Sequence, residues 1–202
     1  MSKGLLIIIS APSGGGKTTL LRELRKSITD VYYSISLTTR KPRSNEKEGI
    51  DYYFVSEEEF IKRKNQGEFI EYAQVHGFWY GTPKSYIDQY LAQNRIVILD
   101  IDVQGGKNIK KIFSDSVLVC IAPPSLSILE TRLRSRKQDD EQTIQRRLKA
   151  AQSELEQAYQ NYDYLIVNDE ISEAADQLRC ILISERLQMK RIERAKIDSL
   201  ES

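Results

Sequence analysis

Apolar residues gather along this chain in short unbroken runs, and longer stretches between the runs place apolar residues three or four positions apart. The unbroken runs have the length of strands and do not alternate with polar residues, which is typical of parallel strands covered on both faces. There are four such runs: Leu5 to Ile9, Ile96 to Leu99, Val117 to Ile121 and Tyr164 to Val167. Strands of this kind predict a buried parallel sheet.

The stretches between the runs carry helix signals. The predicted helices are Thr18 to Lys26, Ser56 to Asn65, Pro83 to Gln93 behind a Thr82 cap, and Ser172 to Ile197. The second begins with a capping box from Ser56 to Glu59. In the last helix we expect core packing by Leu178, Ile181, Leu182 and Leu187, with a dimer contact as the alternative. Strands alternating with helices predict an α/β fold with a doubly wound parallel sheet.

Two segments depart from this alternation. Residues 32 to 80 are rich in tyrosine and contain short alternating runs such as "DYYFVS", which indicate a small mixed β insertion. Residues 132 to 147, "RLRSRKQDDEQTIQRR", are dense in charge and nearly free of apolar anchors. We expect this second segment to be mobile when no ligand is bound.

Composition and charge narrow the class of protein. The chain has 202 residues, 40% of them hydrophobic, which is enough for one domain with a real core. Lys and Arg number 30 against 29 Asp and Glu, so no overall field attracts nucleic acid or an anionic membrane. The opening apolar run is too short for a membrane span, and we expect a cytoplasmic protein. Cys120 and Cys180 are interpreted as buried free thiols, with a disulfide as the alternative.

The stretch "SAPSGGGKTTL" combines a buried strand, three glycines and a helix start. Gly16, Lys17 and Thr18 satisfy the second half of the phosphate-loop pattern, whereas Ala11 stands where that pattern has its first glycine. Glycines let backbone N–H groups turn toward a phosphate, and the helix N-terminus adds its dipole. Lys17 is expected to reach the β- and γ-phosphates, and the Thr18 hydroxyl to bind Mg²⁺. A glycine-rich turn without a ligand is the alternative.

A phosphate loop alone does not identify a reaction, because ATPases, GTPases and kinases share it. A second group of residues suggests an acceptor site. Arg40 and Arg43 flank a Lys-Pro turn, and Tyr52 follows; two guanidinium groups and a phenol suit a terminal phosphate. Glu71 lies further along, before Tyr80 and Thr82. Taken singly, the arginines fit a solvated basic turn and Glu71 an ordinary strand position.

Together these motifs resemble the guanylate kinase family of P-loop nucleoside monophosphate kinases. The resemblance runs through "SAPSGGGKTTL", "SLTTRKPR", "GIDYYFV", "GEFIEYAQVHGFWYGT", "ILDIDVQG", "RRLKAAQSEL" and "YDYLIVND". It implies Mg²⁺-dependent transfer of the γ-phosphate of ATP to GMP. It also implies a core (1–33, 83–123 and 151–202), a GMP-binding insertion (34–82) and a helical lid (124–150).

The resemblance further implies roles for individual residues. ATP would be bound by Ala11, Pro12, Ser13, Gly14, Gly15, Gly16, Lys17, Thr18 and Asn168, with Thr18 and, through water, Asp100 serving Mg²⁺. GMP would be bound by Ser36, Arg40, Arg43, Tyr52, Glu71, Tyr80, Thr82 and Asp102. Catalysis would rest on Lys17, Arg40, Asp100, Arg132, Arg136 and Arg147. A carboxylate at position 71 suits the two donors of guanine's Watson–Crick edge. A turn pair at the end of a strand is the alternative for Asp100 and Asp102.

Two other functions deserve comparison. The same fold serves as a non-catalytic protein-interaction module, but such a module has no need of Lys17 or the lid arginines. A kinase for another nucleoside monophosphate is disfavoured by Glu71 with Ser36 and Thr82. The remaining conspicuous residues, His76, Trp79, Arg134 and Arg146, are interpreted as structural or solvated. We expect ATP and GMP as partners, with dGMP and homo-oligomer formation left open, and no nucleic acid or membrane.

Overall fold

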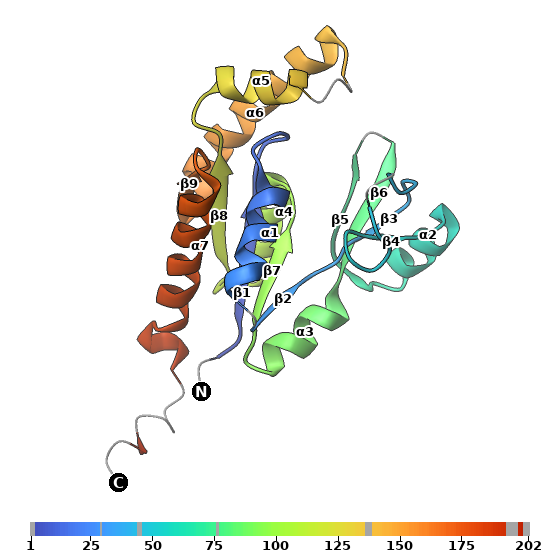
Figure 1. Cartoon of the computed structure of the whole chain (residues 1–202). Coiled ribbons are helices and arrows are strands. Elements are labelled where there is room, and N and C mark those ends of the chain that lie inside the picture. The colour runs from blue at the N-terminus through green and yellow to red at the C-terminus, as the bar shows by residue number, and fades with distance from the viewer. Residues whose placement is uncertain are drawn as a thin grey trace.

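The computed structural model of the chain describes residues 3–28, 30–43, 46–75, 77–135, 139–192 and 198–199. Its centre is a five-stranded parallel sheet in the order β2-β7-β1-β8-β9 (Figure 1). The strands are β1 Leu5–Ser10, β2 Val31–Tyr33, β7 Ile96–Asp100, β8 Val117–Ala122 and β9 Tyr164–Val167. All four strands predicted from the apolar runs are present, within one residue at their ends.

Helices cover both faces of this sheet, as the doubly wound prediction required. On one face, α1 (Lys17–Ser27) and α7 (Ile171–Arg186) pack their leucines against β1 and its neighbours. On the other face lie α3 (Lys84–Ala92), α4 (Val103–Ile112) and the last turns of α6 (Glu141–Asn161). Because every strand points the same way, the loops that follow the strands meet at one edge of the sheet.

The prediction missed one strand of the core sheet. Val31–Tyr33 forms β2 and pairs in parallel with β7, although the tyrosine-rich pattern had placed residues 32 and 33 with the insertion. Its side chains are only half-buried, and the Tyr32 ring stacks on Tyr90 of α3 at 3.8 Å between centroids. A three-residue edge strand with a tyrosine face has no unbroken apolar run to reveal it.

A second, four-stranded sheet forms a separate small layer in the order β4-β3-β6-β5 (Figure 1). The strands are β3 Leu37–Thr38, β4 Tyr53–Phe54, β5 Phe69–Val75 and β6 Phe78–Pro83, with α2 (Glu57–Asn65) packed on them. The β3–β4 pair is parallel and the β3–β6 and β5–β6 pairs are antiparallel, as expected for a mixed insertion. Phe60 of α2 stacks on Phe69 and Trp79, so Trp79 has the structural role expected of it.

Two helix starts differ from the predicted ones. Ser56 caps α2 by accepting from the N–H of Glu59, but the Glu59 carboxylate accepts from Arg63 instead of completing the capping box. Thr82 does not cap α3: it belongs to β6, and Pro83 occupies the cap position without a side-chain hydrogen bond. The Thr82 hydroxyl is thereby free for a different contact.

The charged segment forms part of two helices, α5 (Leu126–Ser135) and α6, which project beyond the core sheet (Figure 1). The prediction that it lacks apolar anchors was wrong in part. Leu133 and Ile144 are both buried, and Leu133 packs with Leu129 and Ala151. Arg134 is exposed and paired with Glu130 and Glu141, in agreement with its solvated interpretation. Arg146 is likewise at the surface, where it donates to the Thr143 hydroxyl.

The C-terminal part corrects two expectations. The last long helix ends at Arg186, and a short 3₁₀ turn, η1 (Met189–Arg191), follows. Leu178 and Leu182 are buried as predicted, whereas Leu187 is 65% exposed. Cys120 is buried in β8, but Cys180 is exposed on α7. Within the described ranges, none of the helices is both long and apolar enough to cross a membrane.

Candidate active site

The loop between β1 and α1 has the backbone of a phosphate-binding loop. Gly14 and Gly16 have φ angles of 96° and 91°, which residues other than glycine rarely adopt. The Gly15 N–H donates to the Pro12 carbonyl at 2.8 Å, which closes the turn. Gly16 is the cap residue of α1, and no side chain caps the helix there. The first N–H groups of α1 therefore point toward a position that suits an anion.

Ala11 causes no strain at the position where the pattern has glycine. Among the described residues other than glycine, only Asn94 has a positive φ, so Ala11 has an ordinary backbone conformation. A Cβ added to Gly15 would lie 3.2 Å from the Ala11 Cβ, which shows that the methyl group packs inside the loop. Alanine therefore occupies this position without backbone strain.

Carboxylates at the end of β7 face the loop lysine. Lys17 forms an ion pair with Asp100 through its Nζ, which also lies 3.4 Å from the Ile101 carbonyl. Asp102 caps α4 by accepting from the Gly105 N–H at 2.7 Å. Thr18 is exposed in the first turn of α1. The structure thus places Lys17, Thr18 and Asp100 at one edge of the sheet, with Asp102 in a structural cap nearby.

Asn168 holds the phosphate loop through a side-chain hydrogen bond. Its side chain is 3% exposed, and its Nδ2 donates to the Gly15 carbonyl at 2.8 Å. A Cβ on Gly16 would come within 2.1 Å of that same nitrogen. The residue follows β9, so the end of one strand holds the loop that follows another. This contact was not predicted, because nothing in "YDYLIVND" indicates which loop its asparagine would reach.

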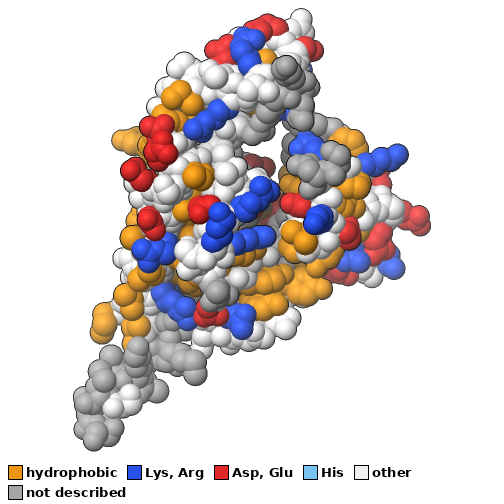
Figure 2. Space-filling view, viewed as in Figure 1, with side chains coloured by type: hydrophobic (Ala, Val, Ile, Leu, Met, Phe, Trp, Pro, Cys, Tyr) orange, Lys and Arg blue, Asp and Glu red, His pale blue; other side chains and the backbone are white. Residues whose placement is uncertain are grey.

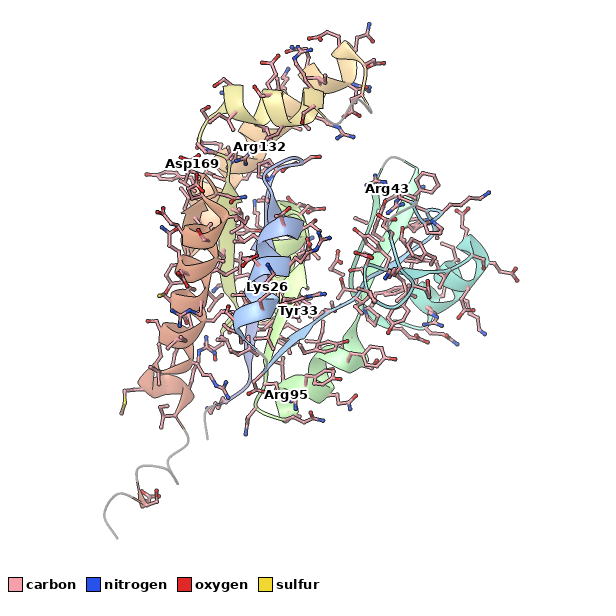
Figure 3. All side chains as sticks on the ribbon, viewed as in Figure 1. Lys26, Tyr33, Arg43, Arg95, Arg132 and Asp169 are labelled. Carbon is pink, nitrogen blue, oxygen red and sulfur yellow. The ribbon has the colours of Figure 1, made fainter. Side chains whose placement is uncertain are left out.

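Arginines of α5 and α6 reach the same edge, and Figure 3 labels Arg132 among them. Arg132 of α5 donates from Nη2 to the Asn168 carbonyl at 3.0 Å, and its Nη1 is buried without a hydrogen-bond partner among the described residues. Arg147 of α6 pairs with Asp139 at 3.1 Å and lies 3.4 Å from the Ser13 hydroxyl. Arg136 falls outside the described residues, as does His76. Two of the three predicted lid arginines are therefore brought to the phosphate loop.

On the small sheet, three predicted residues form one hydrogen-bonded chain. The Thr82 hydroxyl donates to Glu71 at 2.8 Å, and Ser36 lies 3.1 Å from the Thr82 oxygen. Because Thr82 gives its only hydroxyl hydrogen to Glu71, Ser36 must be the donor to Thr82. Burial raises the pKa of Glu71 to about 7, since the Thr82 hydrogen bond offsets only part of the cost and the Asp102 charge adds to it. One carboxylate oxygen of Glu71 accepts from no described residue.

Glu71 also lies close to the core. A Cβ added to Gly105 in the first turn of α4 would be 3.6 Å from Glu71 and 3.5 Å from Asp102. Glycine at this position lets the insertion approach the end of the helix. The predicted base readers Ser36, Glu71, Thr82 and Asp102 are therefore brought together from both layers.

The predicted phosphate clamp is centred on Arg40. Its Nε donates to the Tyr80 hydroxyl at 3.2 Å, and its guanidinium group lies 5.5 Å from the centre of the Tyr52 ring. Burial raises the pKa of Tyr52 to about 12, and the negative charge of Asp100 contributes to the rise. Arg43 comes from the same loop as Arg40 but has an exposed side chain.

Sequence reasoning missed a residue of this clamp. Glu46 accepts from both terminal nitrogens of Arg40, at 3.0 and 2.9 Å, and from the backbone N–H of Arg43 at 2.8 Å. It lies six residues after Arg40 in a loop, where no periodic pattern indicates a partner. Only the folded loop brings the pair together.

The phosphate loop and the clamp face each other across a recess. Figure 2 shows the surface hollowed between the lid helices and the small sheet, with Lys and Arg side chains around the opening. Figure 3 shows Arg132 near the phosphate loop and Arg43 on the opposite layer. A phosphate loop, a second phosphate clamp and a helical arm carrying arginines define the class of P-loop nucleoside monophosphate kinases.

Comparison with known proteins identifies the family within that class. A model of the guanylate kinase family, described as "Guanylate kinase", matches residues 3–185. The chain belongs to the guanylate kinase family, and it is an ATP:GMP phosphotransferase. This confirms the resemblance, the α/β fold class and the enzyme class expected from the motifs, and it disfavours the interaction-module and other-kinase alternatives.

Individual relatives match over nearly the whole chain. Guanylate kinase from Myxococcus xanthus is 46% identical over 96% of this chain and 93% of its own. Guanylate kinase from Rickettsia prowazekii is 45% identical over 92% of this chain and 93% of its own. The crystal structure of guanylate kinase from Anaplasma phagocytophilum has 35% identity and a TM-score of 0.76, and the match covers 95% of this chain and 90% of that one.

Proposed function

We propose that the two halves of the recess bind the two substrates of the ATP:GMP reaction in line. The observation that carries this assignment is the recess between the phosphate loop, where Lys17 pairs with Asp100, and the small sheet, where Arg40 contacts Tyr80 (Figures 1 and 2). ATP would place its phosphates on the loop from Ala11 to Thr18. GMP would place its phosphate on the clamp, so that the acceptor oxygen faces the γ-phosphate. Catalysis of this kind depends on positioning and charge.

The hydrogen-bonded chain on the small sheet would select guanine. Guanine presents two donors, N1–H and N2–H₂, to a carboxylate, whereas adenine presents an acceptor at N1. In this proposal Glu71 accepts from guanine as an ionised carboxylate, and Ser36 and Thr82 hold it in place. Asp102 adds an acceptor on the core side. The high pKa of Glu71 makes its ionisation part of GMP binding.

Lys17 and the lid arginines would balance the charge of the transferring phosphoryl group. Lys17 would exchange its contact with Asp100 for the β- and γ-phosphates, and Arg132, Arg136 and Arg147 would close over the equatorial oxygens. The buried, unpartnered Nη1 of Arg132 supports this role, because it has a donor left to offer when the lid moves. Groups that bind most strongly in the transition state raise the rate of the chemical step.

Magnesium fits the residues on the ATP side. Mg²⁺ prefers oxygen ligands and commonly takes one or two from the protein, with the rest from phosphates and water. The Thr18 hydroxyl and the Asp100 carboxylate are oxygen donors of this kind, the latter through water. When bound, the ion would neutralise charge between the β- and γ-phosphates. In the described part of the chain, no group of three or more His, Cys, Asp and Glu side chains is arranged to hold a metal ion.

The cellular setting is part of the same proposal. A kinase that makes GDP from GMP acts in purine nucleotide metabolism, and we place the chain in the cytoplasm as a protein of small-molecule substrates. Nucleic acid and membrane partners are not expected from a net charge of +1. Asn168 would hydrogen-bond near the adenine of ATP while its amide supports the loop.

The assay of ADP release tests this assignment. Wild-type protein with ATP and Mg²⁺ is offered GMP, AMP, UMP and dTMP in turn, and GMP should give the highest kcat/KM. Lys17→Ala should lose at least about 1,000-fold in kcat, because transition-state charge is no longer balanced. Its fold should persist, since the Asp100 side chain is 40% exposed and stays solvated. A Lys17→Ala variant with wild-type turnover would overturn the assignment.

A further inference from the structure

Arg40 and Glu46 form a bidentate ion pair on the insertion. The two side chains are only 13% and 12% exposed, and the carboxylate meets both terminal nitrogens of the guanidinium group. A third donor, the N–H of Arg43, fixes the other side of the carboxylate. Burial lowers the pKa of Arg40, but the hydrogen bonds to Glu46 and Tyr80 outweigh it and raise the value above the ordinary one.

The pairing decides which edge of Arg40 remains available. A guanidinium group has two bidentate edges: one between Nη1 and Nη2, and one between Nε and Nη2. Glu46 occupies the first edge, and the Lys41 carbonyl takes the other hydrogen of Nη1 at 2.7 Å. On the second edge, Nε contacts the Tyr80 hydroxyl, and one hydrogen of Nη2 has no acceptor among the described residues. The donor left open is therefore the second hydrogen of Nη2, on the side of Tyr80.

Considered by its charge alone, Glu46 should weaken GMP binding. A carboxylate within the clamp lowers the net positive charge that attracts a phosphate dianion, so its removal should strengthen GMP binding if attraction at a distance governs affinity. Orientation would favour a helpful role, because an arginine fixed in advance loses less entropy when it binds a phosphate. The bidentate geometry of these largely buried side chains indicates that orientation outweighs the lost attraction.

We propose that Glu46 is a positioning residue for GMP: it holds the outer edge of Arg40 so that the remaining Nη2 hydrogen, on the side of Tyr80, is directed at the phosphate. This inference rests on the proposed function of the clamp. Glu46 itself does not touch the substrate. Its effect reaches GMP only through Arg40, and this makes the inference separable from a general loss of structure.

Glu46→Gln tests the inference, with Glu48→Gln as the matched control. Both changes remove one negative charge from the same loop, but Glu48 only accepts from the Phe54 N–H, at 3.0 Å. Glutamine at position 46 would turn an amide N–H toward the guanidinium donors. We expect Glu46→Gln to raise KM for GMP about tenfold, in line with the loss of a charge-assisted hydrogen bond. The value of kcat should stay within about threefold and KM for ATP should stay unchanged, while the melting temperature should fall by no more than a few degrees, because the buried guanidinium group loses its charged partner.

Two results would overturn the role of Glu46 while leaving the clamp intact. One is an unchanged or lower KM for GMP in Glu46→Gln. The other is an equal change in Glu48→Gln, which would assign the effect to charge at a distance.

A double-mutant cycle with Arg40→Ala separates this inference from the proposed function. GMP affinity is measured by calorimetry in all four proteins, so that slow turnover does not matter. If Glu46 acts through Arg40, Glu46→Gln should have no further effect once Arg40 is alanine. Additive effects would refute the positioning role and keep the clamp. Unchanged GMP affinity in Arg40→Ala alone would refute the clamp itself, and the role of Glu46 with it.

Discussion

Glu71 would combine two properties that single residues rarely share: it is largely removed from water, and in the proposed function it carries a charge to bind guanine. Its surroundings raise its pKa from 4.5 to about 7, with burial as the largest cause. Without GMP, the proton on Glu71 is therefore lost only near neutral pH. The donors of guanine would supply the partners that the ionised carboxylate lacks.

GMP binding should consequently depend on pH through Glu71. Ionised Glu71 is the binding form, so the Kd for GMP should fall by about tenfold between pH 6 and pH 8 from this group alone. The second ionisation of the GMP phosphate, near pH 6, adds its own change. Glu71→Gln keeps the phosphate contribution and serves as the control. The ratio of Kd for Glu71→Gln to that of wild type, measured by calorimetry, should grow by about tenfold from pH 6 to pH 8. A constant ratio would contradict this.

The same shift has a consequence for stability with the opposite sign. A carboxyl group with a raised pKa binds its proton more tightly in the folded than in the unfolded chain. The contribution of Glu71 to the free energy of unfolding is therefore present below about pH 4.5 and lost as the pH rises to about 7. GMP binding and stability without GMP thus respond to pH in opposite directions.

The sequence could identify the site residues that lie in known motifs. Lys17, Arg40 and Glu71 belong to recognisable stretches, and the structure gives each of them polar partners. Glu46 was not predictable, because its role depends on how one loop closes upon itself. The cap formed by Asp102 was likewise hidden, since a strand-end aspartate can serve a helix, a metal or a base equally well.

Among the elements, the phosphate loop depends on two neighbours that are distant in sequence. The first is Asn168, just after β9, which donates a hydrogen bond to the Gly15 carbonyl. The second is α5, which packs so closely on the loop that a Cβ on Gly14 would lie 2.8 Å from Leu129. The loop, the end of β9 and α5 therefore form one packed unit.

Asn168→Ala should weaken ATP binding by loosening this unit. The change leaves the Gly15 carbonyl without its buried donor, at a cost of about 1 to 3 kcal/mol in the free energy of unfolding. KM for ATP should rise more than KM for GMP, because the loop belongs to the ATP side. Asn161→Ala is the matched control: its Nδ2 also donates to a backbone carbonyl, that of Gln157 at 2.7 Å, but at the surface. Urea unfolding and steady-state kinetics compare the two, and equal losses would contradict a specific support of the loop.

A strand or helix could be predicted where its buried residues form a recognisable apolar pattern in the sequence. The four unbroken apolar runs became strands because both faces of the central sheet are covered. β2 escaped notice because its tyrosines pack by stacking at an edge. In the lid, only two apolar residues of the charged segment, Leu133 and Ile144, hold the helices in place, too few to give a helical period within that segment.

At the scale of the whole molecule, the substrates would bind to different bodies. The small sheet, with the residues of the proposed GMP clamp, lies apart from the phosphate loop and from α5 and α6 (Figure 1), although Glu71 of β5 approaches Gly105 of α4. Lid arginines are held by internal contacts such as Arg147 with Asp139. Binding of both nucleotides would replace these contacts with phosphates and draw the bodies together.

We therefore expect closure to require both substrates. In small-angle scattering, the radius of gyration should fall most with GMP plus a non-hydrolysable ATP analogue, and less with either one alone. Amide hydrogens of residues 126–135 and 139–150 should exchange more slowly only in the ternary complex, because only there do charges on both sides of the lid arginines fix the helices. UMP in place of GMP is the control, since it offers a phosphate without the guanine edge and should bind weakly. Equal protection of the lid with and without both nucleotides would mean that the recess is already in its working shape, and that the lid arginines act without moving.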